Sequence, residues 1–262
     1  MLEMKIPILT YHRITDDGDI SKYTHLVAVE QSKFSSQMQY LVDNGFETIT
    51  ISDLLAMRNG SGRLTDRCLV ISFDDGFESV YRRGMPIMKK NKIRATLFIV
   101  SGFVDTSDYM SWDQILEMKA AGMDIESHTH THPVLTRLSP KKVKEELTTS
   151  KEILEERLQS EITTLCVPGG FTNDMISAIA RECGYSAMCT SYVGLNRLDQ
   201  AHFELRRLGI KGFDSMSKFA GLAHGRTVTI FEYRLRQTGL SALKKVLGVE
   251  NYERMKTFFL GG

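Results

Sequence analysis

The chain has 262 residues, 42% of them hydrophobic and 25% charged, which is long enough for one domain with a substantial core and excludes a disordered or fibrous protein. Lysine and arginine total 33 against 32 aspartates and glutamates, so no global charge attracts nucleic acid or an anionic membrane. We therefore expect a globular protein whose partners are recognised by local chemistry.

The amino terminus lacks the pattern of a secretory leader, because Glu3 lies where the apolar region would be. The longest largely apolar run, 95–104, is far shorter than the roughly 20 residues that cross a bilayer. The cysteines form no CxxC pair and predict buried free thiols: Cys68, Cys166, Cys183 and Cys189. These features predict a cytoplasmic protein without membrane insertion, or an extracytoplasmic one if a leader has been removed.

Short apolar, β-branched runs alternate with segments of helical periodicity along the chain. The predicted strands are 6–11, 68–73, 95–100, 123–127, 162–167 and 187–190. Helical spacing is found at 34–42, 115–120 and 143–158, with Ser111 and Ser139 as helix starts and Gly45 and Gly122 at helix ends. The alternation predicts an α/β fold with a mainly parallel sheet, either a barrel or an open doubly wound sheet.

The region after about residue 227 has a different pattern. Residues 228–231 predict a strand, and two short amphipathic helices are expected to follow, the second ending at Leu260. We predict a main domain over 1–226 and a helical extension over 227–262. We expect the apolar residues of this extension to cover the domain rather than to bind a partner.

Two adjacent carboxylates, Asp74 and Asp75, end the predicted strand 68–73 and precede Gly76. In parallel α/β proteins, functional sites are assembled at the carboxyl ends of strands. An isolated Asp-Asp-Gly is more often a helix cap followed by a solvated neighbour. The pair by itself is therefore weak evidence for a site.

Three of the seven histidines, His128, His130 and His132, fall within five residues at the end of the predicted strand 123–127. Packing does not explain this concentration of imidazoles, and metal binding does. His128 and His132 lie on one side if the loop makes a helical turn, with His130 directed elsewhere. One carboxylate, Asp74 or Asp75, would complete a set that leaves positions open for water and substrate, and the other would be a general base.

These segments resemble the motifs of a known family. Ser72-Phe-Asp-Asp-Gly76 and His128-Thr-His-Thr-His132 are similar to the Thr-Phe-Asp-Asp-Gly and His-Ser/Thr-x-x-His motifs of the polysaccharide deacetylases, carbohydrate esterase family four, with its NodB homology domain. Tyr11-His-Arg-Ile14 resembles the subgroup that acts on poly-N-acetylglucosamine. Cys166-Val-Pro-Gly-Gly170 lies where the family has a Pro-Tyr-Gly loop. The resemblance covers roughly residues 5–215.

The resemblance implies a distorted (β/α) barrel of about seven parallel strands and a hydrolase that removes acetyl groups from N-acetylated, N-acetylglucosamine-type saccharides. It assigns Asp75, His128 and His132 as metal ligands and Asp74 as the general base. It also makes the Gly169 N–H a donor to the oxyanion. The implied cofactor is a divalent metal, first of all zinc, with cobalt, nickel or iron also compatible with these ligands.

The chain departs from the family pattern at two places. Many members carry an arginine two residues before the loop proline, where this chain has Cys166. A similarly placed arginine in members of the family approaches the catalytic carboxylate, so Arg206 or Arg207 is a candidate replacement. A late Leu-x-His motif, which supplies a general acid in many members, has no clean match.

Two histidines outside the motif are candidates for that acid. His224 reads as a residue near a helix end, whereas His12 ends a predicted strand and would reach the rim of the site. We therefore place His12 among the catalytic candidates. Trp112, the single tryptophan, is expected in the core rather than as a platform for a sugar ring.

Two alternative functions remain open at this point. The same scaffold can hydrolyse a different amide or an O-acetyl ester, because the pocket decides the leaving group. Cys166 and the missing histidine motif also suit a catalytically impaired member that only binds a saccharide. The saccharide, its linkage and the oligomeric state do not follow from the sequence.

Overall fold

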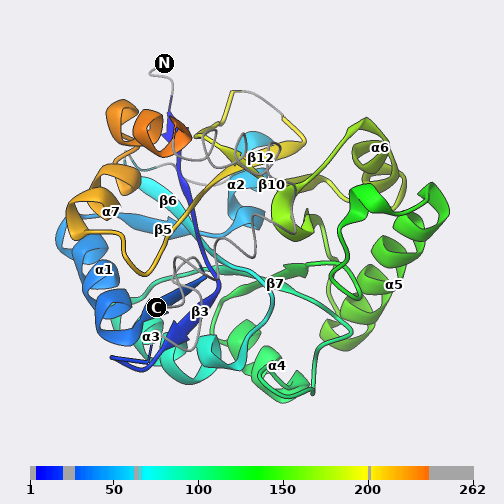
Figure 1. The fold of residues 1–262 in the computed structure, drawn as a ribbon, viewed down its shortest axis with the longest axis horizontal. Helices are drawn as coiled ribbons and strands as arrows, with labels where there is room; N and C mark the ends of the chain where they lie inside the picture. The colour runs from blue at the N-terminus through cyan, green and yellow to red at the C-terminus, as the bar shows by residue number, and fades with distance from the viewer. Residues whose placement is uncertain (1–3, 20–26, 62–64, 66, 200–201, 236–262) are drawn as a thin grey trace, which may run out of the picture.

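The computed structural model describes residues 4–19, 27–61, 65, 67–199 and 202–235. Its centre is a closed ring of seven parallel strands (Figure 1), because β6 pairs with β7 on one edge and with β2 on the other. Around the ring the strands are β2 (Ile8–Tyr11), β12 (Glu204–Gly209), β10 (Ala187–Val193), β9 (Thr164–Cys166), β8 (Asp124–Ser127), β7 (Thr96–Ile99) and β6 (Cys68–Phe73). The predicted seven-stranded barrel is confirmed, and the open sheet is excluded.

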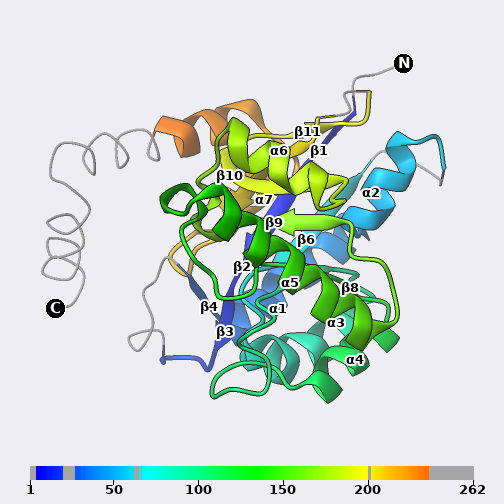
Figure 2. The same ribbon diagram turned by 90° about the vertical axis from the view of Figure 1, so that its right-hand side faces the viewer.

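The barrel is irregular at β6. An eighth strand, β5 (Glu47–Ile49), pairs with the first half of β6 and ends opposite Val70. β7 pairs with the second half of β6. Since β2 pairs with the other edge of β6 from Val70 to Phe73, β5 and β7 share one edge. Two short pairs complete the strands: β1 (Lys5–Ile6) with β11 (Asn196–Arg197), and β3 (Arg13–Thr15) with β4 (Ala28–Glu30). Figure 2 shows these pairs towards opposite ends of β2.

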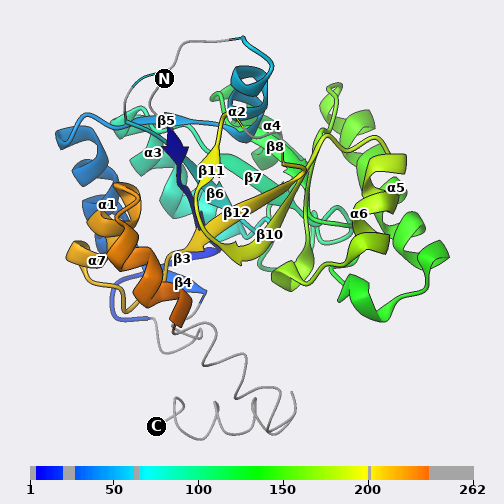
Figure 3. The same ribbon diagram turned by 90° about the horizontal axis from the view of Figure 1, so that it is seen from above.

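Helices surround the ring. They are α1 (Gln31–Asp43), α2 (Ile51–Arg58), α3 (Met85–Asn91), α4 (Trp112–Ala120), α5 (Pro140–Leu158), α6 (Asp174–Glu182) and α7 (Met216–Ala223), with single turns at Val80–Gly84, Leu135–Arg137 and Pro168–Gly170. Figures 1 and 3 show α1 and α7 on one side of the barrel and α5 and α6 on the other. Ser111 and Ser139 cap α4 and α5 as predicted, each accepting a backbone N–H bond from the third helical residue.

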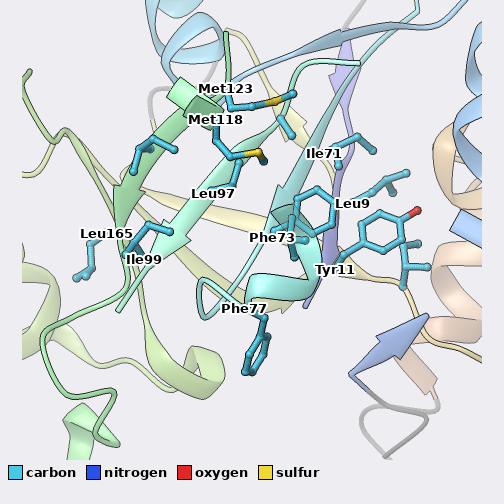
Figure 4. Close-up of a cluster of buried hydrophobic side chains, with 14 of the residues drawn as sticks. Leu9, Tyr11, Ile71, Phe73, Phe77, Leu97, Ile99, Met118, Met123 and Leu165 are labelled. Carbon is cyan, nitrogen blue, oxygen red and sulfur yellow. The ribbon is translucent and has the colours of Figure 1, made fainter. Parts of the chain in front are cut away.

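Apolar side chains fill the barrel and the space between it and the helices. Figure 4 shows part of this core, in which Phe73 of β6 lies beside Tyr11 of β2. Every residue of β6 is buried, and each large apolar side chain of this kind contributes about 1.5–3 kcal/mol to folding. Asp74 and Asp75 follow this strand directly, so a strand that is buried along its whole length positions them.

The extension begins differently from the prediction. Residues 227–235 are helical, so the strand expected at 228–231 is wrong, and residues 236–262, with the two expected helices, lie outside the described residues. The β-branched residues of this segment favour a strand, but a helix buries Ile230 and Tyr233 on one face, and this tertiary packing outweighs the local preference. Among the described residues, no helix combines the length and the apolar character needed to span a membrane.

Candidate functional site

The carboxyl ends of the barrel strands surround one cavity of about 360 Å³. Its lining includes all six residues that the sequence predicts as catalytic or metal-binding: His12, Asp74, Asp75, His128, His132 and Gly169. Residues that are separated by up to 157 positions in the chain therefore meet at one end of the barrel. The arrangement follows from parallel strands, which all present their carboxyl ends to the same side.

Asp75, His128 and His132 form a compact donor set. Oδ1 of Asp75 lies 3.3 Å from Nε2 of His128 and 3.2 Å from Nε2 of His132. Burial by itself raises the pKa of the Asp75 carboxyl, but hydrogen bonds from the two histidines, together with the charges of His128 and His12, outweigh it and hold this pKa well below its ordinary value. The carboxylate is therefore ionised, as a metal ligand must be.

These separations suit a small divalent ion. Bonds of about 2.0–2.1 Å in tetrahedral geometry place neighbouring donor atoms about 3.3 Å apart. The observed separations match that spacing, and three protein donors leave a fourth position for water or substrate. The residues present therefore fit a small divalent metal ion.

The backbone at this site occupies an uncommon conformation. Asp75, Thr129 and His132 have φ angles of 74°, 68° and 59°, in the left-handed region that residues other than glycine rarely adopt. Two of the three are members of the donor set. Strain of about 1–3 kcal/mol per residue persists where function requires a particular side-chain direction.

His128 is oriented by the neighbouring strand. Its ring is buried, and Nδ1 donates a 2.7 Å hydrogen bond to the backbone carbonyl of Cys166. This bond fixes the orientation of the ring, with Nε2 on the side of Asp75, where it is available to a metal. Cys166, noted from the sequence for its side chain, thus contributes through its backbone oxygen.

A second group of possible donors, Asp74, His128 and Cys166, also lies close together. Burial raises the pKa of the Cys166 thiol well above its ordinary value, so the thiolate that binds metals is not available. Asp74 is in addition engaged by an arginine. The Asp75 set is therefore the better metal site.

The arginine is Arg207 of β12, whose Nη1 lies 2.7 Å and 2.9 Å from the two carboxylate oxygens of Asp74. Both side chains are buried. Burial alone raises the pKa of Asp74, but the charge of Arg207, with His12 and His128, outweighs it and lowers this pKa. Of the two arginines considered from the sequence, Arg207 is thus the one that contacts Asp74.

His12 approaches Asp74 from the end of β2, the strand that pairs with both β6 and β12. Its Nε2 lies 3.9 Å from Oδ2 of Asp74, and its side chain is about a quarter exposed to the cavity at 27%. Nδ1 of His12 is buried and finds no hydrogen-bond partner among the residues that the structure describes. The imidazole therefore stands beside the reaction zone with one edge accessible to a ligand.

Other candidates lie elsewhere. His130 points away from Asp75, with Nδ1 3.0 Å from Oγ of Ser101. His224 is the C-cap of α7, 3.2 Å from the Tyr40 hydroxyl. Trp112 does not line the cavity and packs against the hydrophobic core, as expected.

Glu146 of α5 holds the loop 128–132, which carries the three histidines, in place. Its carboxylate accepts hydrogen bonds from the backbone N–H groups of His130 and Thr131, at 3.0 Å and 2.8 Å. The Thr131 hydroxyl adds a third bond at 2.6 Å. Nothing in the sequence pattern marks this residue, because its role depends on how α5 packs.

We expect Glu146→Gln to weaken metal binding by about 10–100-fold, since outer residues that orient ligands typically have effects of this size. Loss of the accepting carboxylate frees the turn that carries His132. Competition with a chelator measures the affinity. Glu145→Gln is the matched control, because the exposed Glu145 lies only 3.9 Å from Lys141 and contacts no histidine. Equal affinities in the two variants would contradict this role.

The sequence pattern marks Arg207 only as one of two candidates, and it does not mark Tyr233 of the cavity wall. In β12, Leu205 and Arg207 are buried while Arg206 is exposed. Because side chains alternate between the two faces of a strand, Arg207 lies on the same inward face as Leu205, and this spacing could have identified Arg207 from the sequence. Tyr233, from the helical residues 227–235, also lines the cavity, and its hydroxyl donates to the Gly209 carbonyl at 3.0 Å.

Comparison with known proteins gives a consistent result. The family model described as polysaccharide deacetylase matches residues 61–188. YxkH of Bacillus subtilis, which carries the name of a polysaccharide deacetylase, is 29% identical over 82% of this chain and 75% of its own length. The poly-β-1,6-N-acetyl-D-glucosamine N-deacetylase of Staphylococcus aureus is 27% identical over 67% of this chain and 68% of its own.

Solved structures extend the similarity to the fold. The Streptococcus pyogenes deacetylase PplD, in complex with acetate, has a TM-score of 0.74 and 27% identity, covering 81% of this chain and 95% of that one. IcaB from Ammonifex degensii has a TM-score of 0.71 and 26% identity, covering 84% and 95% of the two chains.

Proposed function

This chain belongs to the polysaccharide deacetylase family of hydrolases, and on that premise we propose that it is a metal-dependent N-deacetylase that acts on N-acetylglucosamine-type saccharides. One observation carries the proposal: the donor set of Asp75, His128 and His132 shares a cavity with Asp74, a second carboxylate held ionised by Arg207. A ligand set beside a separate base is what amide hydrolysis requires.

Asp75, His128 and His132 would hold the metal, which when bound polarises a carbonyl and makes a neighbouring water more acidic. Asp74 accepts the proton of the attacking water, because its lowered pKa keeps it ionised. The N–H of Gly169 stabilises the oxyanion as it develops. His12 donates a proton to the departing amine, so that acetate and an amino sugar are released.

The substrate class rests on the relatives and on the residues around His12. The Staphylococcus aureus relative is named for deacetylation of poly-β-1,6-N-acetyl-D-glucosamine. In this chain, Tyr11-His12-Arg13-Ile14 places an imidazole at the cavity, next to the barrel core. We infer an N-acetylated glucosamine polymer or oligomer as the substrate.

Metal removal tests the proposal directly. Chelation should abolish acetate release from N-acetylglucosamine oligomers, and one equivalent of zinc should restore it, because the N–H of Gly169 by itself cannot replace the charge of the metal in polarising the amide. Acetate is quantified by an enzyme-coupled assay, with cobalt and nickel compared in parallel. Acetate release that persists after complete chelation would rule out the metal mechanism, and release only from O-acetyl esters would identify an esterase instead.

Arg207→Met should move the acidic limb of the pH–kcat/KM profile to higher pH. In the native protein the pKa of Asp74 lies below its ordinary value, and without the guanidinium burial is left to raise it. The base is then ionised only at higher pH, so activity is lost at the acidic end and recovered at the alkaline end. An unshifted limb with uniformly reduced activity would mean that Arg207 acts through structure alone.

A further inference from the structure

A second cavity, of about 410 Å³, lies near the β1–β11 pair, towards the opposite end of β2 from His12 (Figure 2). Its lining carries four cationic side chains and one carboxylate: Lys5, Arg197, Arg206, Arg234 and Glu204. Glu204 accepts a hydrogen bond from Ser177 at 2.8 Å, and Arg197 is paired with Asp199 at 2.9 Å. Among the side chains that line the cavity, positive charges therefore outnumber negative ones.

Two of the arginines converge on Gly194. A Cβ atom at this glycine would lie 3.3 Å from Nη1 of Arg206 and 3.1 Å from Nη2 of Arg234, so both guanidinium groups surround one point. The two groups are therefore close enough for one anion to contact both of them. Because Gly194 has no side chain, the two arginine side chains have room to approach this point.

Local hydrogen bonds hold the backbone of Arg206 and the side chain of Arg234. The buried Asn196 bonds both the backbone N–H and the carbonyl of Arg206, at 2.9 Å and 2.8 Å. Arg234 donates from Nε to the Val193 carbonyl at 3.1 Å. Among the residues that the structure describes, the guanidinium of Arg206 has no hydrogen bond or ion pair, so its donors are available to a ligand.

The remaining wall is apolar. Phe231 is 59% exposed, and it lines the cavity together with Leu195 and Ile230. Planar guanidinium groups bind phosphoryl oxygens through paired hydrogen bonds, and an adjacent apolar surface accommodates the organic part of an ester. We propose that this cavity binds a phosphoryl group, supplied either by a soluble phosphate compound or by the headgroup of an anionic phospholipid. The proposal is independent of the deacetylase chemistry.

The test measures binding rather than acetate release. Isothermal titration with inorganic phosphate forms one arm, and co-sedimentation with vesicles of 30% phosphatidylglycerol in phosphatidylcholine forms the other. We expect saturable binding in at least one arm, reduced at least tenfold in Arg206→Gln. Arg137→Gln is the matched control, since it removes the same charge from an exposed position elsewhere and should change binding less than twofold.

A third variant tests the geometry. In Gly194→Ala the new Cβ would lie 2.7 Å from Cδ of Arg206, so the flexible arginine must move and binding should fall several-fold with an unchanged melting temperature. Phosphate binding without vesicle binding assigns the site to soluble ligands, and vesicle binding without phosphate binding assigns it to a lipid headgroup. No binding in either arm, or equal binding by the Arg206→Gln protein, would overturn the proposal.

Discussion

Replacing Asp74 by asparagine is expected to lower kcat by about 10²–10⁴-fold while the metal stays bound. Asparagine keeps the shape of the side chain but cannot accept the proton of the attacking water. The metal ligands are untouched, because Asp75 and not Asp74 faces His128 and His132. Steady-state acetate release and zinc stoichiometry, measured on the same preparation, separate the two effects.

The Asp74→Asn protein also carries a structural penalty that must be separated from catalysis. Arg207 is buried, and loss of its partner is expected to cost about 3–5 kcal/mol of folding free energy. The double variant Asp74→Asn/Arg207→Met removes both charges and should regain stability in urea unfolding without regaining activity. Full turnover in the stable single variant would remove Asp74 from the role of base.

His132→Gln is expected to abolish stoichiometric zinc binding and to reduce kcat/KM by about 10³-fold or more, since the several kcal/mol that a metal contributes to transition-state stabilisation are lost. Its ring is about one third exposed, at 36%, so the substitution should leave the fold intact. Zinc content by atomic absorption and unfolding by circular dichroism check both statements.

The same loop supplies the control. His130→Gln changes a histidine only two residues away, whose ring contacts Ser101 instead of Asp75. Zinc affinity should stay within about tenfold of the native value, the lower limit of effects from residues outside the ligand set. Equal zinc loss in both variants would show that the loop, and not His132, is responsible.

Several features were predictable from the sequence because they depend on neighbours in the chain. Strand 68–73 was predicted with its observed bounds, since a continuous apolar run is typical of a strand buried on both faces. The caps at Ser111 and Ser139 bond to the third residue of their own helices. The motif residues Asp74 and Asp75 follow a strand whose end is locally encoded.

Tertiary structure alone decided how these pieces meet. Closure of the ring depends on the pairing of β2 with β6, and the partner of Asp74 is Arg207, 133 residues away. Hydrophobic periodicity records which face of an element is buried, but not which element covers it. The sequence by itself therefore determined the ligand types and their placement at strand ends. The choice of Arg207, the support from Glu146 and the packing of Tyr233 arise only when distant strands and helices come into contact.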